Sequence, residues 1–585
     1  MTVSNSSPIT NELTTAPSPA GSSDLKLGRQ LLFLVLGVTC LAYLATLRFS
    51  FVFDDPLQIV RNPTLTSWRF LPTLFVGHVW KFALPDFAGN YYRPLFMSWL
   101  LLNRMLWGLN PAPWHASALA LHLLATYMAF VVAGQITGNG LQAGMAALLF
   151  GLHPIHIESV AWVSGATDPL MAIFVFAALW AWIRGKSSPS HVAAWRFLSA
   201  VLYLLGCLSK ETAFVLPVLV IAYDHFFGEK RSLPRSIMRA WPLSIAAAVY
   251  LVARILVLRG FEHPIGLPVS HILLSVPTVL WGYVRLLVWP VGLSVFYATP
   301  PVTSVHQWQF WFLLLLGIVA LVGAWWVGRR SGIFAFSVIW ILAFLAPAIL
   351  GLPLFELGDW LHDRYLYVPS FGLCLLIGHT LPIGWKCKAP LLKSISIALS
   401  VLIPVGMCLA TSWQEQPWAN ELLLFTHSAS QQPTSALAKG YLAAELRRRG
   451  DREAAAQEFE AALKLDPNNW KNLADYAMLL YHQGNFQRSD EFFTRALAID
   501  SHDATTHYNQ GLSRFKYDNY AGAEASFREA LRRNPNQPKA HYWLGRSLEL
   551  EGNVDAAQAE YRSEIQLHPD AAVDAQQRLQ LLSGQ

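Results

Sequence analysis

Apolar residues are unevenly distributed along this chain of 585 residues. Between residues 30 and 413 they form runs long enough to cross the hydrocarbon core of a bilayer, which is about 30 Å thick. After Trp413 no such run occurs, and charged residues become frequent. The pattern predicts an all-α protein with a polytopic membrane helix bundle over residues 30–413, a linker over 414–435 and a soluble part over 436–585.

The apolar runs and the loops between them together predict about eleven membrane spans. We place the spans near residues 30–48, 114–134, 140–153, 168–184, 195–209, 211–227, 240–258, 308–328, 332–350, 365–384 and 392–412. Short loops rich in Lys and Arg usually face the cytoplasm, and placing them there leaves the N-terminus inside and the C-terminal part outside. Two further apolar stretches, 94–109 and 271–290, contain Asn, Arg or Pro and are predicted to lie on the outer surface as interfacial helices.

The C-terminal part repeats itself with a period of 34 residues. Prolines, aromatic residues, small residues and turn residues each keep this step. They are Pro433, Pro467, Pro535 and Pro569; Phe459, Phe493, Phe527 and Tyr561; Ala462, Ala496 and Ala530; and Gly450, Gly484, Asp518 and Gly552. This is the tetratricopeptide pattern, in which helix pairs stack to bury their apolar faces. We expect an α-solenoid of four repeats over 436–569, followed by a capping helix over 571–583.

Composition adds three further expectations. The first residues are rich in Ser, Thr, Pro and Asn, and residues 1–29 are predicted to form a disordered cytoplasmic tail. The formal net charge of +6 is small for this length, and the basic residues lie in short loops, so nucleic-acid binding is not expected. The five cysteines lack metal-ligand spacing and lie outside the predicted outer loops, so no disulfide framework is expected.

The first predicted outer loop contains two adjacent carboxylates, Asp54 and Asp55, in an aromatic setting. Burial and repulsion between like charges raise the pKa of a carboxyl group, which suits it to act as a general base near neutral pH. Asp55 also stands directly before Pro56, which is typical of the residue that caps the start of a helix. Taken alone, the motif favours the helix cap.

The second predicted outer loop contains two histidines and a carboxylate within six residues, at His153, His156 and Glu158. Such residues can bind a metal ion or a phosphate. Pro154 lies between the histidines, and the spacing on its own is a weak indication of a metal site.

Three cations, Arg93, Lys210 and Arg364, fall on the predicted outer side, against the usual distribution of positive charge. Cations at this position are candidate contacts for a lipid-linked phosphate. The alternative is that each side chain extends to the lipid headgroups.

Five stretches occur in a characteristic order: FVFDD, YRPL, HPIHIESVAWVSG, SKET and DRYLYVPS. Followed by the repeats, they resemble the transmembrane-and-tetratricopeptide-repeat O-mannosyltransferase family, in a bacterial form. This family belongs to the multispan glycosyltransferases (GT-C type) that use polyprenyl-phosphate sugars. The resemblance extends from about residue 30 over nearly the whole chain. It implies transfer of a sugar such as mannose to a Ser or Thr hydroxyl of a protein, with inversion of the anomeric centre. The reaction is expected on the extracytoplasmic side of a bacterial inner membrane.

The resemblance also implies roles for individual residues. Asp55 takes the proton of the acceptor, Asp54 orients Asp55 or binds sugar hydroxyls, and Glu158 places the donor or acceptor. The three cations stabilise the departing phosphate. Further substrate contacts are expected at His153, His156, Glu211, Asp363 and Tyr365. No metal or other cofactor is required, because cationic side chains can serve a monophosphate donor.

One departure from the family leaves the donor sugar open. Relatives often continue the VSG sequence with Arg and an acidic residue, whereas this chain reads Gly165-Ala166-Thr167-Asp168. The Arg that would contact the sugar or the phosphate is therefore replaced.

Two other functional classes compete with the enzyme. A membrane-anchored scaffold would use the repeats to bind a protein partner, but it needs only one span. A transporter would place ionisable residues at mid-membrane, often in two related halves. Here the charges lie at the outer boundary. The expected partners are a polyprenyl-phosphate-linked sugar, membrane lipid, and a protein acceptor or partner bound by the repeats.

Overall fold

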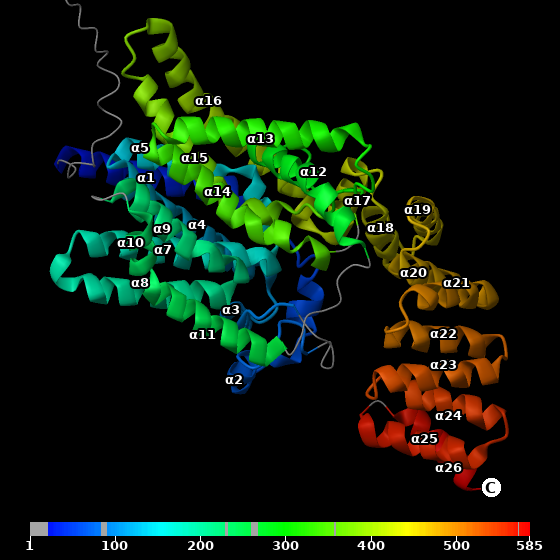
Figure 1. Cartoon of the computed structure of the whole chain (residues 1–585). Helices are drawn as coiled ribbons and strands as arrows, with labels where there is room; N and C mark the ends of the chain where they lie inside the picture. Colours follow the sequence, from blue (N-terminus) through cyan, green and yellow to red (C-terminus); the bar gives the residue numbers. More distant parts are fainter. Residues whose placement is uncertain are drawn as a thin grey trace, which may run out of the picture. The chain divides into compact units, whose positions relative to one another are not determined.

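The computed structural model describes residues 22–82, 90–228, 232–258, 267–355, 358–570 and 572–584. Every regular element within these residues is a helix, which confirms the all-α prediction (Figure 1). The chain divides into two compact units, Met1–Leu424 and Phe425–Gln585.

The first unit contains the long apolar helices. Those of membrane-span length are α4 (Pro111–Thr137), α7 (Thr167–Lys186), α8 (Val192–Ser209), α11 (Trp241–Leu258), α12 (Val269–Val288), α13 (Trp308–Gly328), α14 (Gly332–Leu350) and α16 (Pro390–Gln414). Among the described residues these eight, some extended by a short turn, have the length and composition of a span, and a ninth results if α5 (Gly140–Leu152) and α6 (Ile157–Ala161) form one bent span. The chain is therefore a multi-pass membrane protein.

Shorter helices complete this unit. They are α1 (Ser22–Ala42), α2 (Leu71–Leu74), α3 (Pro94–Trp107), α9 (Leu216–Phe227), α10 (Leu233–Arg239) and α15 (Pro369–Gly384). Helix α17 (Glu421–Gln431) begins in this unit and ends in the second. Because α1 begins at Ser22, the last residues of the predicted tail are helical, and residues 1–21 lie outside the described residues. Helix α17 occupies much of the segment predicted as a linker.

The segment 211–227, predicted to span the membrane, is not one uninterrupted helix. It begins with a 3-10 turn, η9 (Glu211–Val215), and α9 is too short to count as a span by itself. Its two ends nevertheless reach the two ends of α7. Lys210 pairs with Asp168 at one end, and Asp224 pairs with Lys186 at the other. The segment therefore runs along the whole of α7.

Helix α12 has the length and composition of a span, although we predicted that this segment lies on the outer surface. Its carbonyl at Leu287 contacts the His153 ring, and its Ser275 hydroxyl accepts a hydrogen bond from the Val302 N–H at 2.8 Å. The helix also packs against α13 and α14. Its length and composition permit a crossing, and the surface position stays a prediction.

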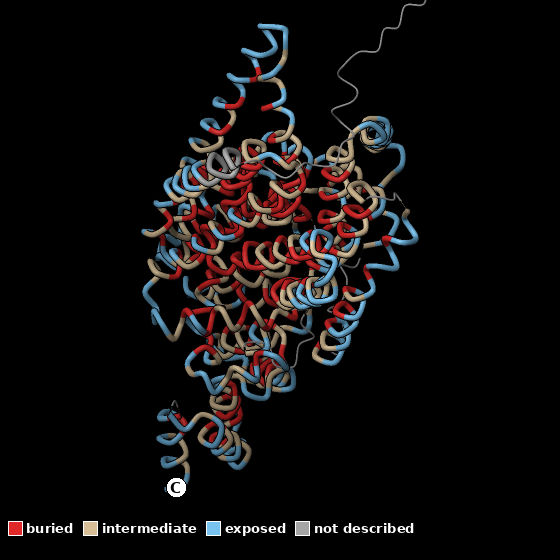
Figure 2. Tube along the Cα trace, turned by 90° about the vertical axis from the view of Figure 1, so that its left-hand side faces the viewer, coloured by how far each residue is buried: buried red, intermediate tan, exposed pale blue. Residues whose placement is uncertain are grey.

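The core of the first unit lies where α5 packs between its neighbours. Buried residues gather inside the helix bundle (Figure 2). A Cβ atom at Gly378 of α15 would lie 2.5 Å from the backbone nitrogen of Ala146 in α5, so only glycine permits this close approach. Helices α7, α8 and α11 run side by side (Figure 1), and their buried residues belong to the same core.

The second unit is an array of antiparallel helix pairs. Its helices are α18 (Ala436–Arg449), α19 (Arg452–Leu465), α20 (Trp470–His482), α21 (Phe486–Ile499), α22 (Ala504–Lys516), α23 (Tyr520–Arg533), α24 (Ala540–Leu550), α25 (Val554–Leu567) and α26 (Val573–Ser583). The turns of the pairs contain Gly450, Gly484, Asp518 and Gly552, all with positive φ. The turn positions predicted from the period therefore share one left-handed conformation.

Substitution of Gly511 by Leu should destabilise the repeats by about 1–3 kcal/mol, because a Cβ atom there would lie 2.6 Å from the Phe527 ring. The measurement is thermal unfolding of the full chain in detergent, together with the rate of proteolysis within the repeats. Arg562→Leu adds the same side chain at an exposed position of α25 and serves as the control. Equal effects of the two substitutions would contradict the proposed packing.

Candidate functional site

Two of the three cations predicted to contact a phosphate are paired with carboxylates at the ends of α7 and α8. Arg93 donates to both carboxylate oxygens of Glu211, at 2.9 Å from Nε and 2.6 Å from Nη2. Lys210 Nζ lies 2.7 Å and 2.8 Å from the two oxygens of Asp168, and both residues are almost completely buried. Adjacent residues 210 and 211 thus connect three segments of the chain.

The third cation, Arg364, is held by Glu158. The backbone N–H of Arg364 donates to Glu158 Oε2 at 2.9 Å, and its guanidinium group pairs with Oε1. The guanidinium carbon lies 5.5 Å from the ring of Trp162 and 5.2 Å from the ring of Tyr365. Both carboxylate oxygens of Glu158 therefore position one arginine between two aromatic rings.

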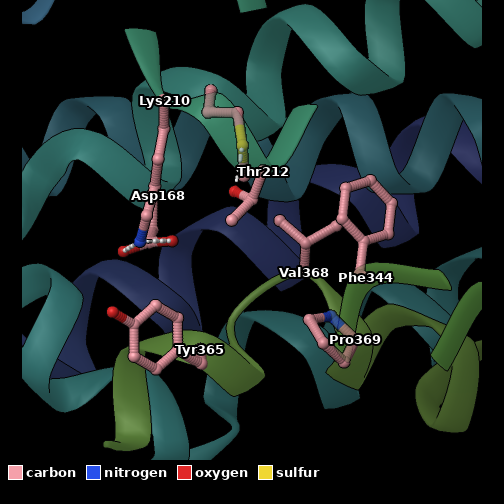
Figure 3. Close-up of a pocket in the computed structure, with 8 residues that line it drawn as sticks. Asp168, Lys210, Thr212, Phe344, Tyr365, Val368 and Pro369 are labelled. Carbon is pink, nitrogen blue, oxygen red and sulfur yellow. Dashed lines mark hydrogen bonds and ion pairs between the residues drawn. The ribbon is translucent and has the colours of Figure 1, made fainter. Parts of the chain in front are cut away.

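Tyr365 lies between the Lys210–Asp168 pair and the Arg364–Glu158 pair, and it borders a small pocket. Lys210 Nζ is 5.2 Å from the centre of its ring. The pocket is partly open to solvent and has room for about one water molecule. It is lined by Asp168, Met171, Lys210, Thr212, Phe344, Tyr365, Val368 and Pro369. Figure 3 shows the ammonium group of Lys210 against the Asp168 carboxylate, with Tyr365 beside the pair and the apolar residues opposite. The pocket therefore has one charged side and one apolar side.

The charges of this cluster shift the pKa values of its members. Burial opposes ionisation of Glu211, but the ion pair with Arg93 outweighs it and lowers the pKa to about 2. Burial lowers the pKa of Lys210, against the attraction of Asp168. Burial also raises the pKa of Asp363, and the nearby Glu158 carboxylate raises it further. Glu211 therefore remains a carboxylate at neutral pH.

The two carboxylates of the first loop differ in exposure. Asp55 is fully buried and accepts hydrogen bonds from Ser164 and Val52, whereas Asp54 is partly exposed. Burial raises the pKa of Asp55 to about 7, even though the Ser164 hydrogen bonds lower it. Its side chain makes no capping hydrogen bond to the turn that follows, η3 (Pro56–Val60). Asp55 therefore stands at the start of the turn, as the cap interpretation requires, but its side chain does not cap it.

The two predicted histidines are buried and do not line the pocket. The Nε2 atom of His153 lies 3.0 Å from the carbonyl oxygen of Leu287, and its Nδ1 accepts the Ile155 N–H. His156 contacts the hydroxyl of Ser370 at 2.8 Å. Within the described residues, no group of His, Cys, Asp or Glu is arranged to hold a metal ion. These contacts make both histidines anchors of the loop that carries Glu158.

Asp363 does not line the pocket either. Its Oδ1 accepts the hydroxyl of Tyr297 at 2.6 Å, which ties the loop after α12 to the Arg364 segment. The first loop reaches the same network through Phe53, whose ring lies 5.3 Å from that of Trp162 beneath Arg364. The structure thus brings the two acidic loops and the Arg364 segment together.

Sequence reasoning missed three contributors to the site. Ser164 lies within the HPIHIESVAWVSG stretch, and Asp168 follows it. Asp168 is an acidic residue in the first turn of the apolar helix α7, and that position was a usable signal. Tyr297 lies in a segment without any motif, and only its contact with Asp363 reveals it.

The comparisons with known proteins agree with both units. Tetratricopeptide-repeat family models match residues 446–508 and 508–572. Protein O-mannosyl-transferase TMTC3 of Homo sapiens is 27% identical over 444 residues, which are 67% of this chain and 46% of that protein. Protein O-mannosyl-transferase TMTC1 of Homo sapiens is 27% identical over 502 residues, 74% of this chain and 55% of that protein. The chain is a homologue of these O-mannosyltransferases. Protein O-mannosyl-transferase F38B6.6 of Caenorhabditis elegans is 26% identical over 470 residues, 77% of this chain and 65% of that protein.

This chain spans about half the length of these relatives, from 46% to 65%. Among solved structures, that of MamA is 25% identical and covers 24% of this chain and 81% of its own, with a TM-score of 0.23.

Substitution of Asp168 by Asn should cost about 3–5 kcal/mol of stability, because it leaves the buried Lys210 ammonium without its counter-charge. We expect the double variant Asp168→Asn/Lys210→Met to recover part of this loss. Thermal unfolding of the full chain in detergent measures both effects. A double variant no more stable than the single one would show that the ion pair does not set the cost.

Proposed function

We propose that the chain transfers a sugar from a polyprenyl-phosphate donor to a Ser or Thr hydroxyl of a protein. The observation that carries this proposal is the pair of fixed cations, Lys210 and Arg364, on either side of Tyr365, in a homologue of O-mannosyltransferases. The small pocket beside them has a charged side and an apolar side. A polyprenyl phosphate has the same division, since an anionic group is joined to an apolar chain. In this proposal the protein lies in a bacterial inner membrane, with the site loops and the repeats on the extracytoplasmic side. The repeats bind the acceptor or a partner.

The cations of the site are suited to the departing phosphate. As the bond between the sugar and the phosphate breaks, negative charge accumulates on the phosphate oxygens. Fixed cations stabilise that charge more in the transition state than in the bound donor. Lys210 and Arg364 flank Tyr365, and Arg93 is joined to them through Glu211 and its neighbour. Their carboxylate partners hold them in place before the donor arrives.

The acceptor needs a carboxylate that it can reach, and Asp54 meets this requirement better than Asp55. Asp55 is fully buried with its oxygens hydrogen-bonded, whereas Asp54 is partly exposed. In the proposed step, the acceptor oxygen attacks the anomeric carbon and its proton passes to Asp54. The bonding pair leaves with the polyprenyl phosphate. A single displacement of this kind inverts the anomeric centre.

Asp54→Asn should reduce transfer by about 10²–10⁴-fold, the range for loss of a general base. The assay uses membranes with the full chain and labelled polyprenyl-phosphate sugars. Asp555→Asn, an exposed change on α25, controls for expression and insertion. If Asp54→Asn retains transfer within about tenfold of the parent while it inserts normally, Asp54 is not the base.

A further inference from the structure

The carboxylate of Asp55 is held by a residue far away in the sequence. Its Oδ1 accepts two hydrogen bonds from Ser164, one from the backbone N–H at 2.8 Å and one from the hydroxyl at 2.6 Å. Its Oδ2 accepts the backbone N–H of Val52 at 3.3 Å. Ser164 belongs to the turn η7 (Val163–Ala166). The Asp55 carboxylate therefore joins the first outer loop to the loop that carries Glu158.

The same carboxylate closes a strained turn. Phe53 lies between Val52 and Asp54 and has a φ of 61°, a left-handed conformation that is rare for a residue with a bulky side chain. Its ring is held between those of Trp162, at 5.3 Å, and Phe296, at 5.7 Å. Such a conformation persists only where the surroundings determine it. The orientation of Asp54, the next residue, therefore depends on these contacts.

The η7 turn is itself fixed against the site. A Cβ atom at Gly165 would lie 2.7 Å from the carbonyl oxygen of Glu158 and 2.8 Å from the Trp162 ring. Only glycine permits this packing. The hydroxyl of Ser164 is thus presented from the same rigid loop that holds Arg364 through Glu158.

We propose that Ser164 is a positioning residue: its hydroxyl holds the buried Asp55 carboxylate, and Asp55 in turn holds the turn that presents Asp54 to the acceptor. This inference rests on the sugar transfer proposed above. In this inference Asp55 positions the site, and Asp54 is the group that contacts the substrate.

The electrostatic balance at Asp55 gives the hydroxyl its effect. Burial raises the pKa of Asp55 to about 7, Asp54 raises it as well, and the bonds from Ser164 and Val52 lower it. The η7 turn adds no titratable group, since its residues are Val, Ser, Gly and Ala. Loss of the Ser164 hydroxyl therefore shifts Asp55 toward its protonated form at neutral pH, which weakens its hold on the turn.

A first measurement is independent of transfer activity. Because the pKa of Asp55 is raised by folding, its contribution to stability is present at low pH and is lost as the pH rises toward about 7. Hydrogen bonds to a charged group are roughly twice as strong as neutral ones, so Ser164→Ala should lower the Tm about twice as much at about pH 8.5 as at about pH 5. Ser199→Ala removes another buried serine hydroxyl, which donates to the Ala178 carbonyl, and should lower the Tm equally at both pH values.

A second measurement follows the transfer rate against pH. Ser164→Ala should move the acid limb of the profile upward by about one pH unit, so that the loss of rate at neutral pH is recovered at higher pH. Ser164→Thr keeps the hydroxyl and should remain near the parent profile. A merely structural role would lower the amount of folded protein without moving the limb.

The two measurements separate the possible failures. If Ser164→Ala and Ser199→Ala show the same dependence of Tm on pH, the hydroxyl does not act on ionised Asp55 and the inference is overturned. If the Tm effect is present but the acid limb does not move, the contact exists without a role in transfer, which also overturns it. A parent chain without transfer overturns the proposed function, and the positioning role with it, even where the Tm measurement confirms the contact.

Discussion

A buried charge at the end of a helix bundle is costly unless an opposite charge lies within hydrogen-bond reach. Three loops of this chain are placed by that constraint. Lys210 is 2% exposed, and its partner Asp168 is 3% exposed. The pair between Arg364 and Glu158 links residues 206 positions apart in the sequence. Because each pair would leave an uncompensated charge if it opened, the loops that carry these residues are fixed relative to one another.

In the proposed function, the same pairs prepare the site for an anion. A cation that is already oriented by a carboxylate needs no rearrangement when negative charge develops nearby, and this kind of preorganisation is a large term in enzymatic catalysis. Tyr365 lies against two of the cations and supplies an aromatic surface beside them. The cost of burying the charges is thus linked to their proposed use. The proposed use also explains why charged residues occur at this end of otherwise apolar helices.

The sequence was most informative where a physical pattern repeats. The period of the repeats located the turn at Asp518, and the structure gives it the positive φ of the equivalent glycines. The motif stretches marked loops that the structure brings into contact, but single residues within them did not reveal their partners. Asp55 was consistent with a helix cap because Pro56 follows it, whereas its actual partner is Ser164, on a different loop. Contacts such as Tyr297 to Asp363 depend on how distant segments pack, which no local pattern encodes.

The most direct test of the account is whether the site binds the phosphate end of a polyprenyl lipid. The measurement is the Tm of the full chain in detergent with polyprenyl monophosphate, compared with the same concentration of the corresponding polyprenol. A ligand that binds only the folded state raises the Tm, so the account predicts a rise with the monophosphate, little change with the alcohol, and loss of the difference in Lys210→Met. Equal shifts with the two lipids in the parent chain would show that the apolar chain alone is bound and would contradict a phosphate site at Lys210 and Tyr365.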